Sequence, residues 1–148
     1  MFRGNSLHTL DDKGRLIIPS RFREVIRSGG GDTLVLTRLE KAVVGYTVNA
    51  WNKLEERILT MADATGQMRD LRRYVVGGAH ECNFDKNGRV LVPPILRKYA
   101  GLEKDIVLVG LLDHFEIWSV DNWDHHTEMI EANIQKGDVY TEIAKLGL

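Results

Sequence analysis

Hydrophobic and polar positions follow a similar order in the two halves of the chain. Short apolar runs rich in Val, Ile and Leu are typical of strands, and apolar residues three or four positions apart are typical of helices. This pattern predicts an α+β protein. The predicted strands cover residues 1–10, 15–18, 33–37, 42–48, 81–84, 90–92, 106–109 and 115–118. The predicted helices cover residues 20–27, 49–61, 67–76, 95–100, 121–134 and 138–148.

The same pattern predicts how some of these elements begin and which sides are buried. Asn49 and Asp121 are expected to cap the N-termini of the two longest helices, because their side chains accept hydrogen bonds from free backbone amides. The apolar run 15–18 does not alternate, which predicts a strand buried on both faces or at a subunit contact. Helical spacing places four residues of the helix 49–61 toward the core: Trp51, Leu54, Ile58 and Met61.

One short motif occurs in both halves, 74 residues apart. Two copies are too few for a solenoid, so we interpret the repeat as a duplicated half-domain, with halves at 1–77 and 78–148. Each half is too small to bury its own strands, and two pseudo-symmetric halves that exchange or share strands would bury them together. The recurring residues are Asp11, Gly14, Arg15, Pro19 and Arg23, and then Asp85, Gly88, Arg89, Pro93 and Arg97.

Each motif begins with the residues of a tight turn. Asp accepts hydrogen bonds from nearby amides, and Gly tolerates a positive φ. Positions four apart approach each other again across such a turn, so Asp11 can pair with Arg15 and Asp85 with Arg89. A guanidinium held in this way suits phosphate oxygens or the edge of guanine. The residues alone leave open a second reading, in which the pairs only hold the turns and bind nothing.

Charge is unevenly distributed, although the net charge of the whole chain is only −1. Residues 1–30 carry six basic and three acidic side chains, whereas residues 113–148 carry two basic and eight acidic ones. An anionic partner would therefore meet the first half of the chain. The alternative is that the separated charges only keep the surface solvated.

Other features of the sequence argue against several classes of function. Cys82 is the only cysteine, and no apolar run approaches the ~18 residues of a membrane span, so we expect a cytoplasmic protein. The triglycine at 29–31 lacks a phosphate-loop context and is read as a flexible connection. No spacing suggests a nucleophile or a metal site, so we expect no enzyme activity, metal or cofactor.

The two motif copies, together with the length of the chain, resemble the MraZ family of bacterial transcriptional regulators, which are related to AbrB-type proteins. The resemblance implies a tandem pseudo-symmetric swapped-hairpin β-barrel of the AbrB/SpoVT type with flanking helices. It also implies a homo-oligomeric ring of eight or twelve subunits that binds double-stranded DNA in the nucleoid. The DNA would be short direct repeats upstream of the division and cell-wall gene cluster, where the protein would act as a repressor.

The resemblance and the motif chemistry together give a set of candidate residues. Lys13 and Arg15 are the leading DNA contacts, and the turn geometry would come from the Asp, Gly and Pro of each motif. The remaining DNA candidates are Arg3, Arg21, Arg23 and Arg89, and the turn residues are Asp11, Gly14, Pro19, Asp85, Gly88 and Pro93.

The sequence leaves open a second function. The protein would then be a non-enzymatic interaction module of the division machinery, which would use the acidic C-terminal half.

Overall fold

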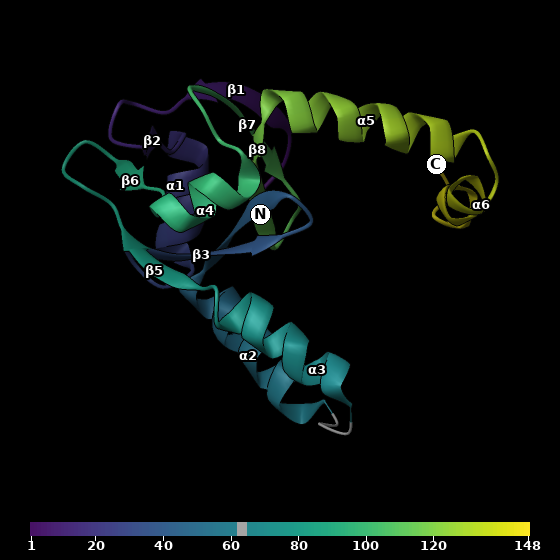
Figure 1. The fold of residues 1–148 in the computed structure, drawn as a ribbon, viewed down its shortest axis with the longest axis horizontal. Coiled ribbons are helices and arrows are strands. Elements are labelled where there is room, and N and C mark those ends of the chain that lie inside the picture. Colours follow the sequence, from purple (N-terminus) through teal and green to yellow (C-terminus); the bar gives the residue numbers. More distant parts are fainter. Residues whose placement is uncertain (62–64) are drawn as a thin grey trace.

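The strands form two antiparallel sheets in a computed structural model, which describes residues 1–61 and 65–148 (Figure 1). The larger sheet has six strands in the order β1-β7-β8-β4-β3-β5, and the smaller one pairs β2 with β6. The bounds are β1 (Asn5–Thr9), β2 (Arg15–Ile17), β3 (Thr33–Leu39), β4 (Ala42–Thr47), β5 (His80–Asn83), β6 (Arg89–Leu91), β7 (Asp105–Gly110) and β8 (His114–Ser119). The predicted strands are all present.

The helices match the predicted pattern with one change, because the expected helix at 67–76 is an α-helix followed by a π-turn. The bounds are α1 (Ser20–Ser28), α2 (Val48–Thr60), α3 (Gly66–Leu71), the π-helix η1 (Arg72–Val76), α4 (Pro94–Ala100), α5 (Val120–Ile134) and α6 (Asp138–Lys145). The predicted fold class, α+β, is thus confirmed.

The N-caps of the two longest helices lie two residues earlier than predicted. The hydroxyl of Thr47 accepts a hydrogen bond from the Ala50 amide at the start of α2, and Ser119 does the same at α5. Asn49 and Asp121 instead lie in the first turns of these helices. The prediction was wrong because a Thr or Ser hydroxyl caps as well as an Asn or Asp side chain, and the strands end directly at the hydroxyl residues.

The two halves exchange their first strands. β1, from the first half, pairs with β7 of the second, and β5, from the second half, pairs with β3 of the first. The strand pairs at the centre of the molecule are related by a pseudo-two-fold axis. In the β2–β6 ladder, Leu16 pairs with its own repeat counterpart Val90. In the same way Val44 on β4 pairs with Glu116 on β8, 72 residues further along the chain, because the second half is about two residues shorter before this point. Strand exchange about such an axis is one of the two arrangements that the repeat predicted, and it is the swapped-hairpin arrangement that the family resemblance implied.

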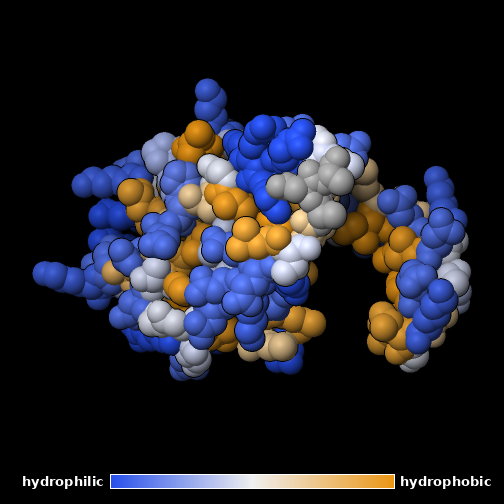
Figure 2. All heavy atoms as spheres, turned by 90° about the horizontal axis from the view of Figure 1, so that it is seen from below, coloured by the Kyte–Doolittle hydropathy of each residue, from blue (hydrophilic) through white to orange (hydrophobic). Residues whose placement is uncertain are grey.

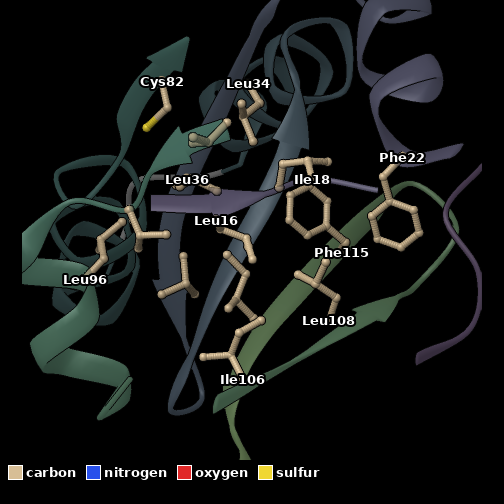
Figure 3. Packing of buried hydrophobic residues seen from close by; sticks show 14 of the residues in the cluster. Leu16, Ile18, Phe22, Leu34, Leu36, Cys82, Leu96, Ile106, Leu108 and Phe115 are labelled. Carbon is tan, nitrogen blue, oxygen red and sulfur yellow. The ribbon is translucent and has the colours of Figure 1, made fainter. Parts of the chain in front are cut away.

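The core lies between the large sheet, the small sheet and the helices α1 and α4 (Figure 3). Three rings form its aromatic centre: Phe2 lies 5.0 Å from Phe22 and 5.1 Å from Phe115 between ring centroids. Of the two readings of the run 15–18, burial on both faces within one chain is wrong, since Leu16 and Ile18 are buried but Ile17 is 60% exposed; the other reading, a subunit contact, stays a prediction. A short two-stranded ladder has only one packed face, so its outward residues stay in solvent.

The C-terminal helices extend away from this core (Figure 1). The beginning of α5 packs on the sheet, where the Trp123 ring lies 5.8 Å from the Trp118 ring between centroids. The rest of α5 leaves the body, and α6 turns back after Gly137, whose φ is 123°. We call the stretch from Met129 to Leu148 the C-terminal arm.

The expected core face of α2 is only partly confirmed. Trp51 and Ile58 are buried and Leu54 is partly buried, but Met61 is 46% exposed. Met61 lies just after the last helical residue, so it does not continue the buried stripe.

Candidate nucleic-acid interface

The two motif turns lie close together on the side of the molecule opposite the C-terminal arm (Figure 1). We call residues 11–14 the first turn and residues 85–88 the second turn. Each turn is hydrogen-bonded to the other half of the chain: the Val92 amide donates to the Gly14 carbonyl at 3.0 Å, and the Ile18 amide to the Gly88 carbonyl at 3.2 Å. The β2–β6 ladder therefore fixes the two turns relative to each other.

In the first turn, Asp11 acts as the centre of a small hydrogen-bond network. Its Oδ1 accepts from the backbone amides of Lys13 (3.0 Å) and Arg15 (2.8 Å). Its Oδ2 accepts from the Arg15 Nε at 2.6 Å. The amide of Gly14 also donates to the Asp11 carbonyl at 2.9 Å and closes the turn.

The second turn repeats this geometry with nearly the same distances. Asp85 Oδ1 accepts from the amides of Asn87 and Arg89, both at 2.9 Å, and Oδ2 accepts from the Arg89 Nε at 2.7 Å. Both of the Asp–Arg pairs expected from the sequence are therefore present. In both arginines the Nε donates to the Asp of the same turn, and a guanidinium carries four further N–H donors on its two terminal nitrogens.

The pKa values of both carboxyl groups are lowered. For Asp11 the largest cause is the hydrogen bond from the Arg15 amide, followed by the Arg15 side chain and the Lys13 amide. The pKa of Asp85 is lowered in the same way, first by the Arg89 amide. Because these bonds favour the charged form, both carboxylates hold their arginines at neutral pH.

Each turn glycine is covered by an arginine from the helix that follows the other motif. The Arg97 guanidinium of α4 occupies the space where a Gly14 side chain would project, and Arg23 of α1 occupies the same space at Gly88. Gly14 and Gly88 have φ values of 83° and 72°. Arg23, which the sequence predicts as a DNA contact, is therefore half-buried against the second turn. Its counterpart Arg97 donates its Nε to the Val92 carbonyl at 2.9 Å.

Three of the remaining predicted cations, Lys13, Arg3 and Arg21, are exposed to solvent. Lys13 lies at the tip of the first turn, and Arg3 and Arg21 lie near it in sequence, with the Arg21 guanidinium 5.4 Å from the centre of the Phe22 ring. Arg15 and Arg89 are intermediate, with side chains 30% and 27% exposed. Hydrophilic side chains project from this side of the molecule (Figure 2).

Sequence reasoning missed Lys86, which is exposed on the second turn. The repeat aligns it with Asp12 rather than with Lys13, so a position-by-position comparison of the turns overlooked it. Neither Lys13 nor Lys86 has a hydrogen bond or ion pair from its ammonium group within the described part of the chain. The signal that could have identified Lys86 is its place on a two-residue turn tip, next to the carboxylate that orients an arginine.

In residues 1–61 and 65–148, no three His, Cys, Asp or Glu side chains are arranged to hold a metal ion. None of the helices in these ranges is long and apolar enough to cross a membrane.

These features define the class of protein. It is an α+β protein of two halves that exchange strands, and each half presents a turn with an Asp–Arg pair. The chain belongs to the MraZ family. The family model described as "MraZ protein, putative antitoxin-like" matches residues 1–73 and 75–140.

Curated relatives match the chain over most or all of its length. A protein of Desulforapulum autotrophicum is 50% identical and one of Desulfosudis oleivorans 45% identical, each over 148 residues that make up all of both chains. A protein of Syntrophobacter fumaroxidans is 42% identical over 135 residues, 91% of this chain and 90% of its own. All three carry the name "Transcriptional regulator MraZ", which describes a regulator and not an enzyme.

Proposed function

We propose that this protein is a sequence-specific DNA-binding regulator of transcription, and that it binds the duplex through its two turns. The observation that carries the proposal is the geometry of the paired turns. Arg15 and Arg89, each held by an Asp, come to one side of the molecule, with Lys13 and Lys86 exposed at the turn tips. The names of the relatives support the same reading.

The two kinds of cation have different roles in this proposal. Lys13 and Lys86 are flexible point charges that neutralise phosphates and set the affinity. Arg15 and Arg89 are planar donors held in one orientation, so they suit the acceptor edge of guanine or two oxygens of one phosphate. Arg3 and Arg21 extend the basic surface on the first half of the chain. Arg23 and Arg97 act through the turns, because they pack against the turn glycines.

The target that we propose is a set of short direct repeats upstream of the division and cell-wall gene cluster, where binding represses transcription. One pair of turns makes few contacts and binds weakly, with a steep dependence on salt. In a homo-oligomeric ring of eight or twelve subunits, once one subunit has bound the DNA, the contacts of its neighbours with the same DNA are effectively intramolecular. The spacing of subunits in the ring then determines which spacing of DNA repeats is bound. The protein would then be found in the cytoplasm, associated with the nucleoid.

The test is fluorescence anisotropy with the upstream DNA and a scrambled duplex at several salt concentrations. Lys13→Glu is the main variant, because Lys13 is exposed and its replacement leaves the fold intact. Lys53→Glu on α2 is the matched control, since Lys53 is also exposed but lies away from the turns. We expect tight binding of wild type and Lys53→Glu to the upstream DNA only, and at least a tenfold loss with Lys13→Glu.

Equal weak binding to both duplexes, unaffected by Lys13→Glu, would overturn the DNA proposal. It would favour the other function that the sequence left open, an interaction module of the division machinery that uses the acidic C-terminal half.

A further inference from the structure

The short β2–β6 ladder has one face that is turned away from the core. Leu16 on β2 and Val90 on β6 lie opposite each other and are both only 1% exposed, so they form the inner face. Side chains alternate between the two faces of a strand, so the residues on either side of Leu16 and Val90 point outward. We call this set the outer face of the ladder, and it consists of Arg15, Ile17, Arg89 and Leu91.

Charged and apolar residues are paired across the outer face. Arg15 lies opposite Leu91, and Ile17 lies opposite Arg89. Both aliphatic side chains remain in solvent, with Ile17 60% and Leu91 50% exposed. A single exposed aliphatic residue is common on protein surfaces. Here, however, the same pairing of an aliphatic residue with an arginine held by an Asp occurs twice, and each pair joins the two halves of the chain.

The two arginines limit what can cover Ile17 and Leu91. The side chains of Arg15 and Arg89 are 30% and 27% exposed, and each donates its Nε to an Asp. An apolar surface laid on the outer face would remove both guanidinium groups from water without supplying acceptors for their other donors, and such burial is costly. The partner must therefore offer acceptors and a small apolar group side by side.

The major groove of duplex DNA offers this combination. It is wide enough for a two-stranded β-ribbon, guanine presents two acceptors there, and the apolar group that it exposes is the C5-methyl of thymine. Residues directly opposite on an antiparallel ladder have Cβ atoms about 5 Å apart. Successive bases of one strand are about 3.4 Å apart. An arginine of the outer face and the aliphatic residue opposite it therefore reach positions one or two base steps apart.

We propose that Ile17 and Leu91 contact the C5-methyl groups of thymines in the DNA target, one or two base steps from the positions that Arg89 and Arg15 hold. This inference rests on the proposed function and deepens it, because it assigns part of the sequence selectivity to two apolar residues. The arginines bind guanine or phosphate. Ile17 and Leu91 distinguish thymine from cytosine, which lacks the methyl group.

Replacing thymine by uracil in the DNA tests the contact, because uracil lacks only the methyl group. Fluorescence anisotropy compares three duplexes: the upstream DNA, the same DNA with uracil for every thymine inside the repeats, and a control with as many uracils outside the repeats. We expect wild type to bind the second duplex at least threefold more weakly than the first, and the control as tightly as the first. Equal binding to the first two duplexes would overturn the proposal.

The variant Ile17→Ala/Leu91→Ala shows whether these two residues sense the methyl groups. Both side chains are exposed, so the substitutions leave the core intact. We expect the variant to bind the thymine duplex at least threefold more weakly than wild type, and to bind the uracil duplex equally well. Leu39→Ala is the matched control, because Leu39 is an exposed leucine outside the ladder, and it should behave as wild type. If the double variant still lost affinity with uracil as wild type does, the methyl groups would act elsewhere and the proposal would be wrong.

The mass of the double variant in solution, measured by light scattering without DNA, tests the other reading of the run 15–18. We expect the mass to equal that of wild type. A fall in mass would assign the outer face to a subunit contact and overturn the proposal. Failure of wild type to bind any upstream duplex more tightly than scrambled DNA would overturn the proposed function and this inference with it. Tight binding that does not depend on thymine would overturn this inference alone.

Discussion

Arg89 of the second turn lies close to Asp11 of the first, with 3.9 Å between Arg89 Nη1 and Asp11 Oδ2. The same Asp11 oxygen accepts the 2.6 Å hydrogen bond from the Arg15 Nε. The acidic residue of one half therefore faces the arginines of both halves. This cross-contact links the two turns into one surface.

We expect Asp11→Ala to lower the stability of the protein more than Asp85→Ala does. Each change removes three hydrogen bonds to the carboxylate, but only Asp11 also faces the arginine of the other turn. The measurement is the midpoint of urea unfolding for both variants. Equal midpoints would show that the contact between Asp11 and Arg89 contributes nothing to the fold.

The free energy of unfolding at acid pH should depend on the same two carboxylates, Asp11 and Asp85. Their pKa values are lowered in the folded protein, so the unfolded chain binds more protons in acid, and their stabilisation is lost as the pH falls. It is fully present above the ordinary carboxyl pKa of 3.8 and declines below it, as the pH passes through the lowered values. Urea unfolding at several pH values between about 5 and 2 measures this decline.

The variant Asp11→Asn/Asp85→Asn is the comparison for the acid titration. Asn keeps the acceptor oxygen and the size of the side chain but cannot titrate. Its stability should change less with pH over the same range. A pH dependence as steep as that of wild type would assign the decline to other carboxyl groups.

Much of the paired-turn geometry followed from the sequence, because it is local. Asp11 and Arg15 are four residues apart on one turn, and the chemistry of Asp and Gly determines how such a turn closes. The exchange of strands was also predictable, since neither half could bury its own. The register then follows from the repeat, as the pairing of Leu16 with Val90 shows.

The non-local contacts could not be read from the sequence. Arg97 covers Gly14 and Arg23 covers Gly88, and in both cases the arginine belongs to the opposite half. The motif showed these arginines recurring after each proline, but only the β2–β6 pairing reveals which turn each one meets. The exposure of Ile17 was missed for a similar reason, because burial depends on what covers the outer face of a ladder.

Gly14→Ala should be more destabilising than Gly31→Ala. Both glycines have positive φ, 83° and 93°, so each change costs about 1–2 kcal/mol of backbone strain. At Gly14 the new methyl group would also meet the Arg97 guanidinium, whereas no atom lies within 4 Å of its place at Gly31. The difference between the two free energies of unfolding, measured in urea, isolates the displacement of Arg97. If the two variants were equally stable, Arg97 would move aside at no cost.

Phe115→Ala should destabilise the protein by about 3–5 kcal/mol, as expected for a large aromatic side chain removed from a core. Phe115 is fully buried, and its ring lies over Gly45, its partner residue on β4. Gly45→Ala would push a methyl group into that ring, so it should also be destabilising. Urea unfolding of both variants checks this. A neutral Gly45→Ala would mean that the sheet can shift to make room.

The thiol of Cys82 should react very slowly in the native protein. It is buried on the exchanged strand β5, opposite Leu34 on β3, and burial raises its pKa to about 11. At pH 8 only about one thiol in a thousand would be ionised, and only the thiolate reacts. A disulfide reagent added to native protein measures the rate, and Leu146→Cys on the arm gives the reference for an exposed thiol. We expect Cys82 to react only when urea unfolds the chain. If it reacted as fast as the exposed thiol, the exchanged strand would have to open readily, and the strand exchange would contribute little to holding the halves together.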